Sequence, residues 1–358
     1  MKIIRIAFFD TKHYDTETFT KAATLAESKL ADDSDTDDSA LDNSVKFEMD
    51  FYEGHLTETS AVFAQNHDVV CIFSNDQVTK RIAEILIEEG VQIIALRSVG
   101  YNNVDMNAIK AINAESKKLQ VVHVPSYSEH STAEFAVALL QALNRKIPKA
   151  YARTRDGFFS TENLMGVELY GKTVGIIGAG KIGKVAAEIF KGYGAKVLLN
   201  AAHQDPSFGQ KIDSEYVNLE EIFKNSNFIM LFCPLVYETR HIINDKCISL
   251  MKKDALIVNI GRGSLIDTNN LFDALNTGRI RGAAFDIFEE DKQNLYGDDW
   301  APSPIRDESF EKLLRLPNVL MTHHQAYLTA ENLMNIATVT LDNIRKVMNG
   351  DECENLIN

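Results

Sequence analysis

One segment restricts the possible folds of this chain more than any other, the run TVGIIGAGKIG at residues 173–183. A strand-like stretch, 173–177, leads directly into three glycines, Gly178, Gly180 and Gly183. The first glycine permits a tight turn, the second lets the backbone approach a pyrophosphate, and the third lets a helix pack on the strand. The N–H groups at the start of that helix then point at the anion. The segment therefore predicts a strand, a turn and a helix that bind a dinucleotide.

The bulk properties of the chain are those of an ordinary globular enzyme. Its 358 residues exceed the usual size of a single hydrophobic core, so we expect two domains. The net charge of −14, without a basic stripe, argues against nucleic-acid binding. No apolar stretch reaches the roughly 20 residues that span a bilayer. Because Arg5 and Asp10 interrupt the apolar N-terminal run, that run predicts a first strand and not a signal peptide.

The cysteines are scattered and include no CxxC pair. They are Cys71, Cys233, Cys247 and Cys353. This spacing argues against a metal knuckle and against a disulfide framework, and it favours reduced thiols in the cytoplasm.

An acidic insert lies at about residues 31–44. The run LADDSDTDDSALDN, between Lys29 and Ser44, contains six aspartates and no aromatic residue. Such a segment buries too little apolar surface to order itself, so we predict a solvated loop. The spacing of a calcium-binding loop is not met.

Short β-branched runs alternate with helix-length segments along both halves of the chain. The strands predicted in the first half are 4–9, 69–73, 91–96 and 121–124. Those predicted in the second half are 173–177, 196–200, 228–232, 255–260, 282–287 and 318–322. This alternation predicts βα units and parallel sheets, the second of them doubly wound. A predicted helix at about 129–146 would bridge the two domains, and a second at 329–350 needs a docking surface.

Polar segments follow three of the later predicted strands, where an open α/β sheet places its site. Arg262, between two glycines, suits bidentate binding of a carboxylate. Acids at 286–291 follow the next strand, and His323 and His324 follow the last. A histidine whose pKa a carboxylate raises can donate a proton to a carbonyl oxygen at neutral pH. A zinc site is disfavoured, because the two adjacent histidines have no nearby cysteine and no helical partner.

The second element of the dinucleotide fingerprint is absent. An acid roughly 20 residues after the glycines, at the tip of the next strand, would bond the adenosine ribose. Here Asn200 is followed by Ala201 and Ala202, and Asp205 comes a few residues too late. No arginine is placed to pair a 2′-phosphate. The residues therefore leave the choice between NAD and NADP open.

Five motifs occur in a fixed order: GIIGAGKIG (175–183), CPL (233–235), NIGRGSLID (259–267), DIFEED (286–291) and HQAYLTAE (324–331). With them the chain resembles the D-2-hydroxyacid dehydrogenase family, and within it the branch that acts on pyruvate and D-lactate. The likeness runs nearly end to end and leaves out only the acidic insert.

This resemblance implies a two-domain α/β fold. A Rossmann-type doubly wound cofactor domain would span 126–325. A flavodoxin-like parallel α/β substrate domain would combine 1–125 with 326–358. The resemblance also implies a cleft at the domain junction, hinge closure over the ligands, and a homodimer formed through the cofactor domains.

The implied activity is the reversible reduction of a small 2-keto acid, pyruvate by preference, with NAD(H). His324 would be the general acid and Arg262 would bind the substrate carboxylate. The backbone N–H groups of Val99 and Gly100 would complete the carboxylate site. Two tyrosines would line the substrate pocket, Tyr101 and Tyr327. The implied cofactor contacts are Gly178, Gly180, Lys181, Ile182 and Gly183 at the pyrophosphate, Cys233, Pro234 and Thr239 on the adenosine side, Ile260, Gly261, and Asp286 at the nicotinamide.

The chain departs from the family at the partner of the histidine. The family places a glutamate five residues after the aspartate, and here that position is Asp291, one methylene shorter. Asp291 is our predicted catalytic partner of His324. Alternatively Glu290 replaces it, or the pKa of His324 is raised less and the activity optimum lies lower.

Two other functions compete with reduction of pyruvate. The chain could reduce another 2-keto acid, such as glyoxylate, hydroxypyruvate or phenylpyruvate, although Tyr101 and Tyr327 suggest a confined pocket. It could also be a dinucleotide-sensing protein like the transcriptional corepressors with similar motifs, in which the acidic insert would bind a partner. Against the latter, the sequence contains no nuclear-localisation run of lysine and arginine.

Overall fold

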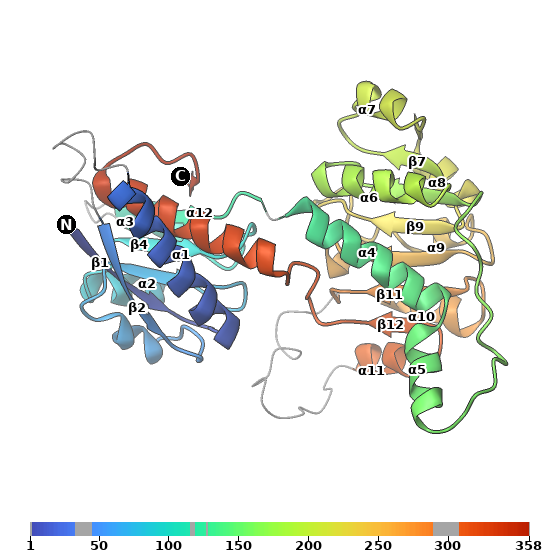
Figure 1. Cartoon of the computed structure of the whole chain (residues 1–358), viewed down its shortest axis with the longest axis horizontal. Coiled ribbons are helices and arrows are strands. Elements are labelled where there is room, and N and C mark those ends of the chain that lie inside the picture. The colour runs from blue at the N-terminus through green and yellow to red at the C-terminus, as the bar shows by residue number, and fades with distance from the viewer. Residues whose placement is uncertain (1, 33–44, 115–118, 127, 289–307, 358) are drawn as a thin grey trace. The chain divides into compact units, whose positions relative to one another are not determined.

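The computed structural model describes residues 2–32, 45–114, 119–126, 128–288 and 308–357. The chain divides into two compact units (Figure 1). The first unit comprises Met1–Ser128 and Leu328–Asn358, and the second comprises Glu129–Tyr327. Each unit is built on one mainly parallel sheet. The predicted α/β class with two parallel sheets is therefore confirmed.

The sheet of the first unit has the strand order β13-β5-β4-β3-β1-β2, and only β13 is antiparallel to its neighbour. Its strands are β1 (Lys2–Phe8), β2 (Val45–Phe51), β3 (Val69–Ile72), β4 (Ile93–Leu96), β5 (Gln120–His123) and β13 (Leu356–Ile357). The four runs predicted as strands all lie in this sheet. The prediction lacks β2, because it rested on continuous apolar runs, whereas the apolar residues of β2 alternate with Lys46, Glu48 and Asp50, a pattern typical of a half-buried edge strand.

The described part of the first unit also contains four α-helices and a short 3₁₀ helix. They are α1 (His13–Asp32), α2 (Lys80–Glu88), α3 (Met106–Ala114), α12 (Ala330–Asn349) and η3 (Ser60–Ala64). As predicted, Thr329 caps the start of α12 and Gly350 ends it with a left-handed φ of 79°. The docking surface of α12 consists of α1, β4 and β5. Residues 33–44 of the predicted acidic loop lie outside the described residues, and α1 extends to Asp32.

The sheet of the second unit is wholly parallel, with the strand order β12-β11-β10-β9-β6-β7-β8. Its strands are β6 (Thr173–Ile177), β7 (Lys196–Asn200), β8 (Glu215–Tyr216), β9 (Phe228–Leu231), β10 (Leu256–Asn259), β11 (Gly282–Phe285) and β12 (Val319–Met321). The six predicted strands are confirmed. The strand β8 is too short to produce a sequence pattern.

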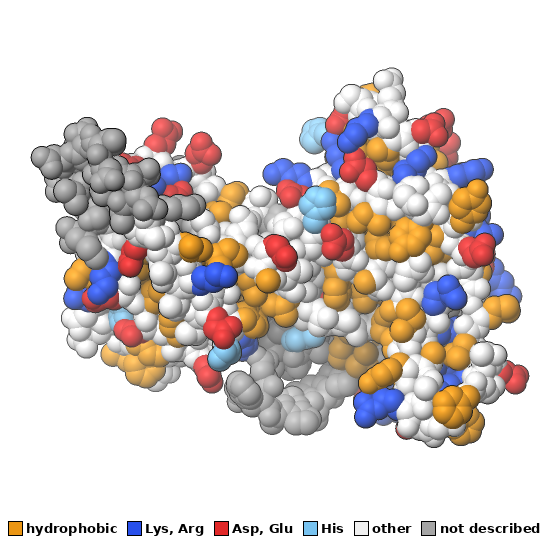
Figure 2. Space-filling model, viewed as in Figure 1, with side chains coloured by type: hydrophobic (Ala, Val, Ile, Leu, Met, Phe, Trp, Pro, Cys, Tyr) orange, Lys and Arg blue, Asp and Glu red, His pale blue; other side chains and the backbone are white. Residues whose placement is uncertain are grey.

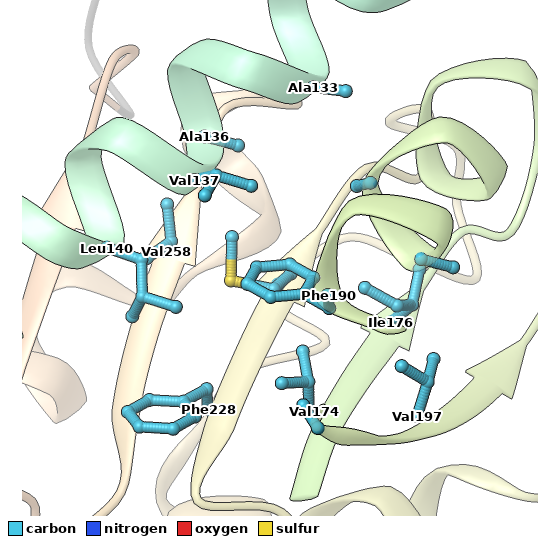
Figure 3. Packing of buried hydrophobic residues seen from close by; sticks show 14 of the residues in the cluster. Ala133, Ala136, Val137, Leu140, Val174, Ile176, Phe190, Val197, Phe228 and Val258 are labelled. Atoms are coloured by element: carbon cyan, nitrogen blue, oxygen red, sulfur yellow. The ribbon is translucent and has the colours of Figure 1, made fainter. Parts of the chain in front are cut away.

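Helices cover both faces of this second sheet, as a doubly wound fold requires. They are α4 (Glu129–Asn144), α5 (Ile147–Arg155), α6 (Lys181–Gly192), α7 (Pro206–Lys211), α8 (Leu219–Asn225), α9 (Asp245–Ile248), η4 (Gly263–Leu265), α10 (Thr268–Asn276) and α11 (Glu308–Leu314). On one face Val174 and Ile176 of β6 pack under α4 and α6, as Figure 3 shows. On the other face Ile177 packs with residues of α8, α9 and α10. The helix α4 lies wholly in the second unit.

Among the described residues, Arg97, which follows β4, is the largest fully buried side chain. One guanidinium nitrogen lies 2.9 Å from a carboxylate oxygen of Asp15. The other donates to the backbone oxygens of Phe9 and Asp10, at 2.6 and 3.1 Å. Asp10 has a left-handed φ of 49°, and this contact helps to hold that conformation. Arg97 therefore ties the ends of β1 and β4 to α1.

Replacing Arg97 by methionine is expected to lower the free energy of unfolding by about 3–5 kcal/mol, because Asp15 would remain buried without its cation. Urea denaturation measures the change. The matched control is Arg279→Met, which breaks an exposed pair with Asp245 and should cost less than about 1 kcal/mol. Equal losses in the two variants would contradict the role of Arg97.

None of the helices in the described ranges is long and apolar enough to cross a bilayer.

Candidate functional site

The glycine turn between β6 and α6 has two glycines that the fold requires and one that it does not. Gly178 has a φ of 97°, and a Cβ there would lie 2.3 Å from the backbone nitrogen of Cys233. A Cβ at Gly183 would lie 2.2 Å from the oxygen of Gly178. A Cβ at Gly180 would meet nothing within 4 Å. Gly178 and Gly183 thus permit the turn and the close helix, whereas Gly180 faces open space.

That open space is suited to a pyrophosphate. Gly180 is the N-cap of α6, and no side chain of the described residues caps the helix there. The helix begins with Lys181 and Ile182, whose positions in the first turn are those that present N–H groups to an anion. The turn therefore fits the predicted dinucleotide, and a Cβ at Gly180 would fill the cradle.

Replacing Gly180 by valine is expected to raise the Kd for NADH at least tenfold, because the side chain would occupy the cradle. The free energy of unfolding should change by less than about 1 kcal/mol, since no protein atom is displaced. Fluorescence titration and urea denaturation measure the two quantities. Gly192→Val, at the other end of α6 and also in open space, is the matched control and should bind NADH normally.

The ends of β7 and β9 border the turn. The N–H groups of Gly178 and Ala179 donate to the backbone oxygen of Asn200, the last residue of β7, at 2.9 and 3.0 Å. Cys233 follows β9 and is buried, and burial raises the pKa of its thiol to about 11. The Thr239 hydroxyl donates to the oxygen of Pro234 at 2.7 Å. Thr239 therefore closes its own loop, and the cofactor contacts of Cys233, Pro234 and Thr239 remain predictions.

The loop that carries Arg262 is fixed by a buried amide. Asn259, at the end of β10, donates from its amide nitrogen to the oxygen of Arg262 at 2.9 Å. Its amide oxygen accepts from the N–H of Gly261 at 3.0 Å. A Cβ at Gly261 would lie 2.9 Å from Leu265 and 3.0 Å from the oxygen of Cys233, which explains the glycine. The Arg262 side chain itself is exposed at the carboxyl edge of the sheet.

The loop that carries His324 is fixed by a buried carboxylate. Asp286, directly after β11, is 1% exposed. One of its oxygens accepts from the Thr322 hydroxyl at 2.6 Å and from the N–H of Gln325 at 3.0 Å. The other accepts from the N–H of Ala326 at 2.8 Å. The N–H of His324 donates to the backbone oxygen of Asp286 at 2.7 Å, and His324 has a left-handed φ of 43°. Asp286 thus organises the loop, and its contact with nicotinamide remains a prediction.

The described groups around His324 lower the pKa of its imidazole. Burial lowers the pKa of the His324 imidazole below its ordinary value, and the positive charge of Arg262 lowers it further. The Asp286 carboxylate opposes this shift but does not reverse it. The rise in the pKa of His324 that its predicted carboxylate partner would cause is not tested by these groups and stays a prediction. Asp291 and Glu290, the predicted partners, lie outside the described residues.

In the second unit the structure brings several predicted residues together. Arg262 and Asp286 are close enough to His324 to shift its pKa. The Tyr327 ring lies edge-on to His324, with centroids 6.1 Å apart. A guanidinium, a carboxylate and an imidazole thus lie close together at one sheet edge. The described residues contain no group of three or more histidine, cysteine or acidic side chains that could hold a metal ion.

The substrate-binding residues predicted in the first unit lie in the loop after β4. Nδ1 of His123 lies 2.9 Å from the oxygen of Val99, and the Ser98 hydroxyl donates to the oxygen of Gly100 at 2.7 Å. The Tyr101 ring lies edge-on to His123, with centroids 5.7 Å apart. The loop is thus anchored through its carbonyl groups, and its contact with a substrate remains a prediction.

Two residues of the site were not assigned a role from the sequence. Asn259 and Thr322 hold the loops of Arg262 and His324, as described above. Each is a polar residue at the end of an otherwise apolar run. That position is the signal that could have identified them.

Comparisons with known proteins agree with this geometry. The model of the family "D-isomer specific 2-hydroxyacid dehydrogenase, NAD binding domain" matches residues 137–326. The chain is 39% identical over 354 residues to a 2-hydroxyacid dehydrogenase homolog of Haemophilus influenzae, and the match covers 99% of both proteins.

Solved structures of full-length relatives have the same fold. The apo-structure of D-lactate dehydrogenase from Escherichia coli matches with a TM-score of 0.85 and 35% identity, over 99% of this chain and 100% of that one. The NAD-complexed D-isomer specific 2-hydroxyacid dehydrogenase from Lactobacillus delbrueckii ssp. bulgaricus matches with a TM-score of 0.77 and 28% identity, over 99% and 100%. The predicted NAD cofactor is thereby confirmed.

Proposed function

Because this chain belongs to the D-isomer specific 2-hydroxyacid dehydrogenase family, we propose that it is a D-lactate dehydrogenase, which reduces pyruvate reversibly to D-lactate. The chain is an NAD-dependent 2-hydroxyacid dehydrogenase that acts on a 2-keto acid. The narrower assignment to pyruvate is supported by the similarity to the D-lactate dehydrogenase of Escherichia coli over nearly the whole length of both chains.

One observation carries the proposal. Arg262 and His324 follow two strands of the same sheet, β10 and β12, at its carboxyl edge. That sheet also presents the glycine turn after β6. A cation for a carboxylate and an imidazole for a proton therefore lie in the same unit as the dinucleotide cradle. This combination is what reduction of a 2-keto acid requires.

NADH, when bound, supplies the hydride that adds to the keto carbon. As that bond forms, the π electrons of the carbonyl move to its oxygen, and the His324 imidazolium donates a proton there. The products are the 2-hydroxy acid, NAD⁺ and a neutral His324. In the reverse direction the neutral His324 takes the hydroxyl proton.

The substrate carboxylate needs a separate partner. We propose that the Arg262 guanidinium binds it with two parallel hydrogen bonds and helps to polarise the keto group. We further propose that the backbone N–H groups of Val99 and Gly100 donate hydrogen bonds to this carboxylate. In the same proposal, Tyr101 and Tyr327 limit the size of the substrate side chain. This limit favours the methyl group of pyruvate.

A substrate panel tests this proposal. The pure protein is assayed for NADH oxidation with pyruvate, glyoxylate, hydroxypyruvate and phenylpyruvate, and the product is assigned as D or L by chiral chromatography. We expect the highest kcat/KM with pyruvate, and D-lactate as its product. A higher kcat/KM with another acid would assign the chain to a different reductase. Tight NADH binding without turnover of any keto acid would favour the dinucleotide-sensing alternative.

We also propose that the protein is a homodimer. Hydrophobic side chains gather on the surface over α5 and the segment that follows it (Figure 2). Phe158, Phe159, Met165 and Tyr170 are 67, 79, 87 and 76% exposed. Exposed apolar clusters of this kind mark interaction sites, and a second copy is the partner that the family resemblance implies. Light scattering should give twice the chain mass of 40.1 kDa, and Phe159→Asp should give monomers.

The proposed compartment is the cytoplasm. Cys71, Cys233 and Cys247 are buried and form no disulfide, which suits a reducing environment.

A further inference from the structure

The tip of β7 differs from the usual NAD-binding fingerprint at one position. The oxygen of Asn200 accepts from the two N–H groups at the start of the glycine turn, so residue 201 lies immediately beside that turn. The Ala201 methyl group is partly buried and packs with the cluster under α4 and α6. It therefore lies on the face of the sheet that carries α6. An acid at this strand tip would bond the adenosine ribose and repel a 2′-phosphate.

The acid nearest in sequence cannot replace the missing one. Asp205 is the N-cap of α7, and one of its oxygens accepts from the N–H of Phe208 at 3.1 Å and from the Ser207 hydroxyl at 2.5 Å. Its other oxygen lies 2.5 Å from Nζ of Lys184, in the first two turns of α6. Turning Asp205 toward a ribose would break the cap and the ion pair together. Asp205 is thus committed to the structure of its own loop.

The charges near the tip of β7 cancel, because Lys184 and Asp205 form an ion pair. Lys184 hydrogen-bonds Asp205 and holds the pKa of that carboxyl well below its usual range, so the pair stays ionised and mutually neutralised. Residues 200–204 add no acid. The positive end of the α6 dipole and the Lys184 ammonium border the same loop. A 2′-phosphate, with its additional charge of about −1.5 to −2, would meet no unpaired carboxylate among these described residues.

We propose that Ala201 is the residue that sets cofactor selectivity in this chain, and that through it the enzyme binds NADPH about as well as NADH. The inference rests on the proposed function only in placing a nicotinamide dinucleotide at the glycine turn. The 2′-phosphate would lie beside the Ala201 methyl group, and the nearby cation would be the Lys184 ammonium, which stays paired with Asp205. Selectivity thus depends on the strand tip and not on the catalytic residues.

The test measures binding and needs no turnover. Kd values for NADH and NADPH are determined by nicotinamide fluorescence with the full chain and no keto acid. In the wild-type protein we expect the two values to agree within about tenfold. Ala201→Asp should raise the Kd for NADPH about 30-fold or more, because like charges are then adjacent, and should leave the Kd for NADH equal or lower.

A second variant tests the role of the Lys184 ammonium. Asp205→Asn keeps a good N-cap for α7 and removes only the charge that holds Lys184. It should lower the Kd for NADPH several-fold without changing that for NADH. Gln210→Glu, which adds the same charge as Ala201→Asp at an exposed position of α7, is the control and should change neither value.

Each outcome separates this inference from the proposed function. If wild-type protein binds NADPH more than 30-fold more weakly than NADH, the inference is wrong, whatever the substrate panel shows. If Ala201→Asp and Gln210→Glu have equal effects, residue 201 is not the selector. If both dinucleotides bind equally but pyruvate is not reduced, the inference holds and the proposed substrate fails.

Discussion

Replacing His324 by glutamine is expected to lower kcat for pyruvate reduction about 10³-fold, the central value for loss of a general acid. Glutamine is of similar size but cannot donate a proton to the keto oxygen at a useful rate. The Kd for NADH should change less than threefold, because the glycine turn is untouched. Steady-state assays and fluorescence titration measure the two quantities.

The adjacent histidine provides the control. His323 is exposed, and His323→Gln should keep kcat within threefold of the wild-type value. His324 has a left-handed φ of 43°, which glutamine must also adopt, so unfolding curves check that both variants are folded. A kcat for His324→Gln within tenfold of the wild-type value would remove His324 from the mechanism.

The lowered pKa of His324 also predicts how this loss depends on pH. Reduction needs the imidazolium, so its kcat/KM should fall as the pH rises above the pKa of His324 in the free enzyme. Because burial lowers that pKa below the ordinary value of a histidine, the decline should already be under way at pH 7. Oxidation of D-lactate needs neutral His324, so its kcat/KM should be level above pH 6.5. If Asp291 raises this pKa, Asp291→Asn shifts the decline to lower pH, whereas Glu290→Gln does not.

The second large effect concerns Arg262. Arg262→Gln is expected to lower kcat/KM for pyruvate about 10²–10³-fold, since the variant loses both the charge and the planar pair of donors at the carboxylate. Arg262→Lys should recover only part of this loss, because an ammonium cannot bind in bidentate fashion. Steady-state assays at constant pH measure kcat/KM for the wild-type protein and for each variant.

Removing Arg262 should also change the pKa of His324. The guanidinium is one of the groups that lower this pKa, so Arg262→Gln should move the pH decline of the residual activity upward. Arg279→Gln, an exposed arginine of the same unit, should alter neither quantity. An unchanged pH profile in Arg262→Gln would contradict the proximity of Arg262 and His324.

Much of the fold could be predicted from the sequence, because the buried strands of both sheets are short apolar runs. The strands β6 and β9 are buried on both faces and contain almost only apolar residues, as parallel strands do. The edge strands β2, β8 and β13 escape prediction for the opposite reason. In β2 the apolar residues alternate with charged ones, and β8 and β13 have only 2 residues each, so none of the three is a continuous apolar run.

The identity and the order of the motifs predict which side chains belong to the site and what chemistry they offer. Arg262 and His324 stand at strand ends, where topology brings them to one edge. The direction of the pKa shift of His324 could not be predicted, since it depends on how deeply the imidazole is buried and on its distance from Arg262. The roles of Asn259 and Asp286 likewise depend on loop geometry. Spacing along the chain contains neither kind of information.

The division of the first unit between the two ends of the chain has a consequence for biosynthesis. That unit is incomplete until α12 has packed on α1 and β13 has paired with β5, with Leu356 opposite Val122. Residues 129–327, however, leave the ribosome before α12 and β13 do. The second unit can therefore fold first, although its sequence begins later, and residues 1–128 must wait for the last segment to be synthesised. A chain truncated before α12 should accordingly protect the second unit, but not the first, from protease.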